Sequence, residues 1–333
     1  MQIEKYIKGG YHHRIGVNII GGLKGEMLKM GNKSIWKILA ILMVFVLAMI
    51  IVMPSAAAVS ESDGVSSSAT IYVPDSYPTI QAAVDTASPG DTIIVRDGTY
   101  RENIEVNKRL TIKSENGSVN CIVEAENRDD HVFEVTARYV NISGFTVTGA
   151  YYGEAGIYLY HADHCSISNN NCSNNRWFSG IHLEDSENNT ISNNNCSNNV
   201  YGISLDESEN NSITNNNCSN NRGKGIYLRY SKNNSISNNN CSNNDEGIFI
   251  YDSENNTIAN NTCSNNDGHG IYLWYSKNNS ISNNICCSNN QRGSGIRPCG
   301  IRLTHSKDNS ISNNNCSNNG YAGISLHASD NIA

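Results

Sequence analysis

The chain has 333 residues, of which 17% are charged, and a formal net charge of −7 at pH 7. The first 58 residues hold seven of the 24 Lys and Arg side chains but only two of the 31 Asp and Glu side chains, so the rest of the chain is strongly acidic. Because phosphate binding requires clustered Lys and Arg, this distribution argues against nucleic acid as a partner.

The first recognisable segment is an apolar run from Ile38 to Met53, preceded by lysines and followed by the small residues Ser55 to Ala58. A basic region, a short apolar region and small residues in this order are typical of a secretory signal peptide. An uncleaved membrane anchor is the alternative, although the run is shorter than the ~20 residues of a typical span. Either interpretation predicts that the remainder is secreted, exposed at the cell surface or periplasmic.

This segment divides the N-terminal part of the chain. A signal peptide begins close to its apolar region, so we interpret residues 1–29 as an extension upstream of the true start. We interpret residues 30–58 as the signal peptide or membrane anchor, and residues 59–70 as a linker. Membrane contact is expected only through the apolar segment or through an anchor beyond the C-terminus.

Residues 71–155 are expected to form an N-terminal cap followed by degenerate turns of a repeat structure. Apolar residues at helical spacing between Ile80 and Ala87 predict a short helix with one apolar face, and Pro78 suits its start. A helix here would cover the open end of a core. Strands are predicted at Thr92–Val95, Asn103–Val106, Leu110–Lys113, His131–Val135, Val140–Ile142 and Phe145–Val147.

From residue 156 to residue 333 one pattern recurs: G-I-x-L-x-x-S-x-N-N-S/T-I-S-N-N-x-C-S-N-N. Its Gly-Ile pair begins at residues 156, 180, 202, 225, 247, 270, 300 and 323, and its Cys falls at residues 172, 196, 218, 241, 263, 286 and 316. The steps are 22 to 24 residues long, with one step of 30. Self-similarity at this period indicates a solenoid.

The apolar positions of each repeat fall in short alternating segments, which are typical of strands rather than helices. In one repeat Ile226 and Leu228 are followed by Ile236 and then by Cys241. Three short strands that close on themselves every 22 to 24 residues make one turn of a parallel β-helix, and parallel crossovers are nearly always right-handed. We therefore predict an all-β, right-handed, single-stranded parallel β-helix with three strands per turn and a short N-terminal capping helix.

This fold accounts for the repeated Asn and Cys. Asn tolerates the left-handed backbone that a sharp bend requires, and its amide can donate and accept hydrogen bonds along a stack. Cys replaces an inward aliphatic residue and behaves there as a small buried hydrophobe. We therefore predict stacked bends of Asn, reduced and packed thiols, no metal site and no cofactor.

The segment YPTIQAAVDTASPGDTIIVRDGTYRENIEV, residues 77–106, resembles the entry segment of pectin-lyase-like β-helix proteins, including pectin methylesterases. The NNTISNNxCSNNxxGIxL units resemble the NosD-type periplasmic copper-maturation family and many surface proteins with the same repeats. The resemblance covers about residues 71–333. It implies the β-helix fold, but that architecture serves lyases, hydrolases, esterases and non-catalytic surface proteins alike.

Aromatic residues recur at the outward positions of G-I-x-L-x. They are Tyr158, Tyr160, Tyr227, Phe249, Tyr251, Tyr272 and Trp274. Strand alternation places them on the outer face of one sheet, where a strip of rings usually marks a contact surface and can stack on sugar rings. The alternative is that these rings only stabilise the strands by stacking on one another.

The step of 30 residues contains an insertion within CCSNNQRGSGIRPCGIRL, and loops on a solenoid often carry specificity. We take Arg292, Arg297 and Arg302 as candidate binding residues of this insertion, which also offers a possible Cys287–Cys299 pair. A tolerated duplication of Gly-Ile is the alternative.

No catalytic motif of this fold is complete, so we predict no catalytic residue. His269 in DGHGI resembles the Gly-His-Gly motif of polygalacturonases, but inverting hydrolysis needs paired carboxylates, which the neighbouring repeats lack. A lyase-like cluster is a weaker alternative, and it would consist of Glu184, Asp185, Asp206, Glu207 and Arg229.

The function we predict is that of a non-catalytic structural or adhesion module that binds extracellular or cell-wall polysaccharide or another component of the cell envelope. The first alternative is a polysaccharide-degrading lyase or hydrolase, and the second is a NosD-like periplasmic copper-maturation protein. Because the sequence stops within a repeat, we also expect further modules beyond Ala333.

Overall fold

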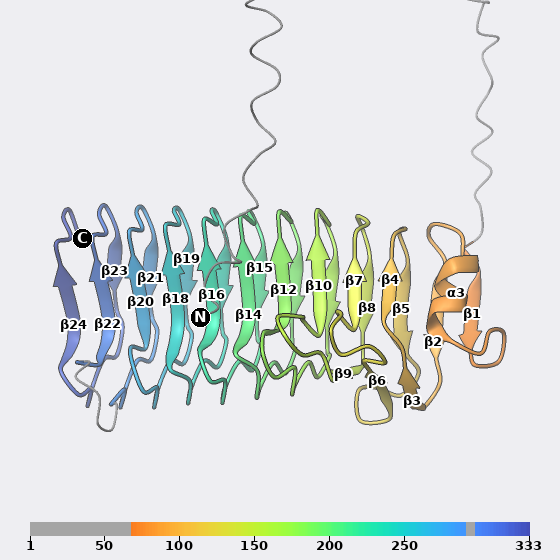
Figure 1. Cartoon of the computed structure of the whole chain (residues 1–333). Coiled ribbons are helices and arrows are strands. Elements are labelled where there is room, and N and C mark those ends of the chain that lie inside the picture. The colour runs from red at the N-terminus through yellow and green to blue at the C-terminus, as the bar shows by residue number, and fades with distance from the viewer. Residues whose placement is uncertain (1–67, 291–296) are drawn as a thin grey trace, which may run out of the picture. The chain divides into compact units, whose positions relative to one another are not determined.

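A computed structural model describes residues 68–290 and 297–333. The chain coils into a stack of turns whose strands pair in parallel with the equivalent strands of the turns before and after (Figure 1). The predicted parallel β-helix is therefore confirmed. The predicted signal peptide or anchor lies outside the described residues, and no helix within them is long and apolar enough to cross a membrane.

Three parallel sheets form the walls of the solenoid. Within the described ranges, the first sheet has 11 strands: β1 (Thr70–Val73), β2 (Thr92–Val95), β5 (Thr111–Ser114), β8 (Asn141–Ser143), β11 (Ser166–Ser168), β13 (Thr190–Ser192), β15 (Ser212–Thr214), β17 (Ser235–Ser237), β19 (Thr257–Ala259), β21 (Ser280–Ser282) and β23 (Ser310–Ser312). The second sheet has ten over the same ranges: β4 (Ile104–Val106), β7 (Phe133–Val135), β10 (Ile157–Tyr160), β12 (Ser179–Glu184), β14 (Tyr201–Asp206), β16 (Lys224–Arg229), β18 (Glu246–Tyr251), β20 (Ile271–Trp274), β22 (Cys299–Thr304) and β24 (Ala322–His327).

The third sheet changes along the stack. Full strands occur only in the early turns that the structure describes: β3 (Gly98–Arg101), β6 (Cys121–Glu124) and β9 (Thr146–Thr148). In the regular repeats this wall continues as single bridging residues, such as Asn195 paired with Asn217. Two Asn bends flank this segment closely, so each regular turn has two strands and a one-residue third side.

The predicted capping helix is α3 (Ile80–Thr86), which lies beside β1 and β2 in Figure 1. Thr79 caps its first turn by accepting a hydrogen bond from the Ala82 N–H at 3.1 Å. The Glu102 carboxylate accepts from the N–H groups of Ile80 and Gln81 at 3.0 and 2.9 Å. Ile80, Ala83 and Val84 are buried, so the helix closes this end of the apolar core as predicted.

Each bend of the regular turns uses a pair of asparagines with different tasks. The first member is left-handed: Asn193 has φ 57° and Asn215 has φ 58°. The second member is buried and points inward, where the Nδ2 of Asn194 donates to the Oδ1 of Asn216 at 3.1 Å. Both predicted roles of Asn, the bend and the ladder, are thus confirmed, and they belong to neighbouring residues.

The core is built from stacked files of identical residues. Ile226, Ile248 and Ile271 are register partners with no exposed surface. All eleven cysteines are free thiols. The Cys287–Cys299 pair considered above is therefore wrong, because Cys299 is buried in β22 while the Cys287 thiol lies beside the Ser317 hydroxyl at 3.1 Å.

Candidate functional site

The outer face of the second sheet carries two parallel files of side chains, which we call the first and second outward files. In the strands from β10 to β22 the first file contains Tyr158, His182, Ser204, Tyr227, Phe249, Tyr272 and Arg302. The second file lies two residues further along each strand and contains Tyr160, Glu184, Asp206, Arg229, Tyr251, Trp274 and Thr304. The seven predicted aromatic residues therefore share one face, in two files.

The rings of these files stack on one another along the solenoid. The Tyr227 and Phe249 centroids are 5.4 Å apart with planes at 11°, and those of Phe249 and Tyr272 are 5.1 Å apart at 34°. In the second file Tyr251 and Trp274 meet edge to face rather than stacked, with centroids 5.4 Å apart and planes at 62°. Stacking leaves each ring partly covered, and Trp274 is the more exposed member of this pair, at 37%. Part of each ring's area thus stabilises the sheet and part faces solvent.

The first outward file is interrupted at β14, where Ser204 takes the place of a ring. A depression of about 400 Å³ opens at this interruption, which we call the first depression. Its apolar wall comes from Phe178, Tyr201 and Tyr227. The Tyr201 and Tyr227 centroids are 5.4 Å apart. A missing ring in an otherwise continuous stack therefore creates a hollow with aromatic walls.

Charged groups line the same depression. The Arg229 guanidinium forks onto the carboxylate of Asp206, with Nε 2.8 Å from Oδ1. The Glu184 carboxylate accepts a hydrogen bond from the Tyr158 hydroxyl at 2.8 Å. His182 and Tyr158 beside it lower the pKa of Glu184 to about 2, so this carboxylate stays ionised at neutral pH.

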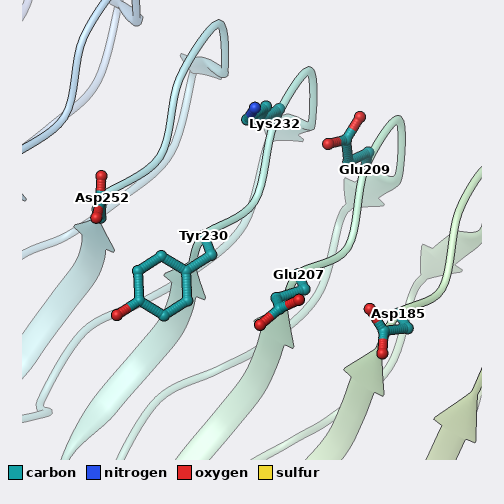
Figure 2. A pocket seen from close by; sticks show the side chains of 6 residues that line it. All are labelled: Asp185, Glu207, Glu209, Tyr230, Lys232 and Asp252. Carbon is teal, nitrogen blue, oxygen red and sulfur yellow. The ribbon is translucent and has the colours of Figure 1, made fainter. Parts of the chain in front are cut away.

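A second depression of about 510 Å³ lies where the same strands end, and Figure 2 shows six of its side chains. Asp185, Glu207, Tyr230 and Asp252 directly follow β12, β14, β16 and β18 and have left-handed φ angles of 48°, 46°, 51° and 45°. Glu209 and Lys232 complete the rim. Four of these six side chains are carboxylates, so this surface is acidic.

The two depressions correct the proposed lyase-like cluster. Glu184 and Asp206 line the first depression, whereas Asp185 and Glu207 line the second. Consecutive residues separate because the backbone turns left-handed just after the strand ends. In the part of the chain that the structure describes, no group of three or more His, Cys, Asp or Glu side chains is placed to hold a metal ion.

Comparison with known proteins identifies the family. A family model described as "Periplasmic copper-binding protein (NosD)" matches residues 84–296. The chain belongs to the NosD family. The cell surface glycoprotein of Methanothermus fervidus is 41% identical over 100 residues, 29% of this chain, and the match spans only 16% of that protein's length. The names of the family and of this relative both place those proteins outside the cytoplasm.

Solved structures share the fold of this NosD-family chain. The ORF18 protein of Geobacillus virus E2 matches with a TM-score of 0.62 at 13% identity, over 79% of this chain and 61% of that one. The Dettilon tailspike protein matches with a TM-score of 0.53 at 14% sequence identity, over 77% of this chain and 68% of that one. The enzymatically active domain of bacteriophage CBA120 tailspike protein 2 matches with a TM-score of 0.55 at 14% sequence identity, over 74% of this chain and 42% of that one. At these identities the likeness shows the fold alone.

The copper in the family's description can be tested against the thiols of this chain. Cys218, Cys241 and Cys263 stand in one file with no exposed surface. Burial raises the pKa of each of these thiols well above its ordinary value, whereas copper is bound by thiolates whose donors converge on one point. These three thiols therefore do not fit a copper ion, and we derive no copper chemistry for them.

The three arginines assigned to the insertion are not equivalent. Arg292 lies outside the described residues. The Arg297 guanidinium covers the ring of Tyr321, 5.0 Å from its centroid. Arg302 is in β22 rather than in the loop, because Gly300-Ile301 starts a regular strand and leaves Arg302 at its outward position, over the Tyr272 ring. Arg302 thus extends the first outward file.

His269 has a structural role. Its Nδ1 accepts a hydrogen bond from the backbone N–H of Cys299 at 3.0 Å, and only 4% of the residue is exposed. Burial, followed by the charge of Arg302, lowers the pKa of His269 from 6.5 to about 4. The neutral ring is therefore the form that the folded state requires.

This histidine predicts a pH dependence of stability. Between pH 6.5 and about 4 the unfolded chain takes up a proton at His269 that the folded chain does not, so stability falls as the pH falls through that range. The loss from this group is at most about 3 kcal/mol. Urea unfolding of the full chain from pH 7 to 4 should show a shallower pH dependence for His269→Gln than for the wild type. If the free energy of unfolding changed with pH equally in the variant and the wild type, His269 would not be the source of this pH dependence.

The pattern of aromatic residues missed four parts of the site: Phe178, His182, Tyr201 and Ser204. His182 and Ser204 occupy the variable position of G-I-x-L and could have been found by following that position whatever its residue type. Phe178 and Tyr201 precede the Gly-Ile pairs, where the residue type varies freely, so no repeated signal marks them.

Proposed function

We propose that this NosD-family chain is an extracytoplasmic surface or adhesion module that binds polysaccharide across the outer face of its second sheet. Aromatic faces next to hydrogen-bonding groups suit sugar rings, which have apolar faces and hydroxyl edges. The two outward files offer rings at strand spacing, and the first depression adds Asp206 and Arg229 as polar partners.

The observation that carries the proposal is the interruption of the first outward file at Ser204. His182 and Tyr227 lie on β12 and β16, two strand spacings or about 10 Å apart. The walls of the hollow between them are aromatic, and its charged groups are already paired with one another. A hollow of about 400 Å³ is the size of a small-molecule site, so it can take one or two sugar units of a chain lying along the files.

Binding without cleavage of the glycosidic bond fits the charges of the site. A glycosidase needs a carboxylic acid that is protonated before it meets the leaving oxygen. Glu184 is ionised at neutral pH, and Asp206 is held by Arg229. The cell-surface relative and the periplasmic family support a location outside the cytoplasm, at the cell surface or secreted. The acidic second depression favours a neutral or amino-sugar chain over an acidic one.

The test is retention of the full chain on native affinity gels that contain cellulose derivatives, soluble chitin, chitosan, pectin or alginate. Tyr227→Ala and Trp274→Ala should each weaken retention by about tenfold, which corresponds to about 1.4 kcal/mol of lost stacking. Tyr139→Ala is the matched control, because this exposed ring stacks on His164 outside both files. Equal retention of the variants and the wild type on every gel would refute the proposal.

A further inference from the structure

Three side chains of the first depression form a series that binding alone does not require. The Oγ of Ser204 lies 2.8 Å from the Nδ1 of His182, and the Nε2 of His182 lies 3.7 Å from the Oε2 of Glu184. The strands β12 and β14 pair in the register that sets His182 beside Ser204. All three residues line the same hollow.

The series works as a relay in one tautomer of His182, the one with hydrogen on Nε2. Glu184 accepts a hydrogen bond from the Tyr158 hydroxyl, and its carboxylate lies 3.7 Å from the Nε2 of His182, which is too far for a hydrogen bond but favours hydrogen on that nitrogen. In this tautomer Nδ1 accepts the Ser204 hydroxyl proton at 2.8 Å, whereas the Ser204 carbonyl oxygen, 3.3 Å from Nδ1, accepts hydrogen only from the other tautomer. The Tyr158 ring stacks on the imidazole at 5.4 Å and 8°, which holds its orientation.

A neighbouring hydroxyl completes the network. The Oγ of Ser179 lies 2.6 Å from the Oγ of Ser204. In the tautomer that directs the Ser204 proton to His182, Ser179 is the donor in this contact. Ser204 is therefore held by two partners, with its proton directed at a base, as a serine nucleophile must be.

We propose that Ser204, His182 and Glu184 act as a nucleophilic triad that hydrolyses a small acyl ester on the bound polysaccharide. Ser204 is only 3% exposed, so the proposal is restricted to the smallest acyl groups, such as acetyl. Arg229, whose guanidinium forks onto Asp206, lines the same hollow.

The reaction needs only water as a second reactant. Ser204 Oγ attacks the acyl carbon while its proton passes to His182 Nδ1, and the ester C–O bond then breaks as this proton moves to the departing sugar oxygen. Water attacks the acyl-serine, gives a proton to Nδ1, and the carboxylic acid leaves as Ser204 regains that proton. Glu184 does not touch the substrate and is a positioning residue that stabilises the imidazolium.

The proposal concerns the same depression as the proposed function, but its test needs no polysaccharide, so the two can fail separately. The full chain is incubated with a fluorophosphonate probe, and the labelled residue is identified by peptide mass spectrometry. We expect the label on Ser204. A probe attached to other residues only, or to none, would overturn the proposal even if every variant below failed to fold.

Hydrolysis of 4-nitrophenyl acetate supplies the second measurement. Ser204→Ala and His182→Gln should each lower the rate at least about 100-fold. Ser235→Ala is the matched control, because Ser235 is an exposed serine of β17 in the first sheet, outside both outward files, and should leave the rate unchanged. Residual hydrolysis in Ser204→Ala above half of the wild-type rate would count against the triad.

The positioning residue has its own readout. In Glu184→Gln an imidazolium forms less readily, so the maximal rate should fall by about 10- to 100-fold and the acidic fall in rate should begin at a lower pH. A purely structural role would lower the rate without moving the profile, and that result would remove Glu184 from the triad. Ser204→Ala should still be retained on the polysaccharide gels.

Discussion

Gly225→Ala is expected to destabilise the full chain by about 3 kcal/mol, at the upper end for one added methyl group. A Cβ at Gly225 would lie 2.6 Å from the carbonyl oxygen of Gly247 in the next turn and 2.9 Å from the carbonyl oxygen of Cys218. Both neighbours are backbone atoms of paired turns, so neither can move without breaking the stack. Lack of space, not a left-handed φ, therefore requires glycine here. Urea unfolding of the full chain, followed by far-ultraviolet circular dichroism, measures the loss.

Gly323→Ala is the matched control for this substitution. Gly323 stands in the same file, and a Cβ there would also lie 2.9 Å from a cysteine carbonyl, that of Cys316. The three atoms nearest to this Cβ would all belong to Cys316, so the loss should be clearly smaller than at Gly225. If the two variants lost equal stability, contact between turns would not be the reason for the glycine file.

The regular turns could be predicted from the sequence because their signals are local and repeat. The alternation of Ile and Leu after each Gly-Ile pair identifies an inward face, and the period identifies the neighbour in space. The helical spacing after Pro78 marked α3 for the same reason. Thr92–Val95 was predicted with the bounds that the structure gives β2.

The strands β1, β3 and β6 were not predicted, although the residues of β1 and β6 are typical of strands; only β3 carries little signal of its own. Strand β3, Gly98–Arg101, is largely exposed and contains one aromatic residue. It is a strand because Gly98 pairs with Cys121 and Thr99 with Ile122 in the next turn. Pairing with a neighbouring turn determines whether such a segment forms a strand, and the sequence of a single turn does not reveal that pairing.

The site could be predicted only in outline. Alternation placed the aromatic residues on one face, yet it could not show that Ser204 opens a hollow, since that depends on the rings of adjacent turns. Nor could it separate Asp206 from Glu207, which face different depressions because Glu207 has a left-handed φ of 46°. Both features arise from contacts between turns.

Asn216→Ala is expected to cost about 4 kcal/mol, although a neighbouring asparagine can be replaced at little cost. The Oδ1 of Asn216 accepts from the backbone N–H and the Nδ2 of Asn194 at 2.9 and 3.1 Å. Its Nδ2 donates to the carbonyl of Ile191 at 2.9 Å and to the Oδ1 of Asn239 at 3.1 Å. Alanine leaves the partners of Asn216 without hydrogen bonds. Each buried polar group that water cannot reach then lowers the free energy of unfolding by about 1–3 kcal/mol.

The adjacent Asn215 is the matched control, because it is exposed and has φ 58°. Asn215→Gly should change the free energy of unfolding by less than about 0.5 kcal/mol, since glycine adopts this conformation freely. Asn215→Val should cost about 1–2 kcal/mol, because a branched Cβ is crowded in the left-handed region. Urea unfolding of the three variants at pH 7 separates the two roles of the pair. If Asn215→Gly and Asn216→Ala cost the same, the division between a residue that bends and a residue that bonds would be wrong.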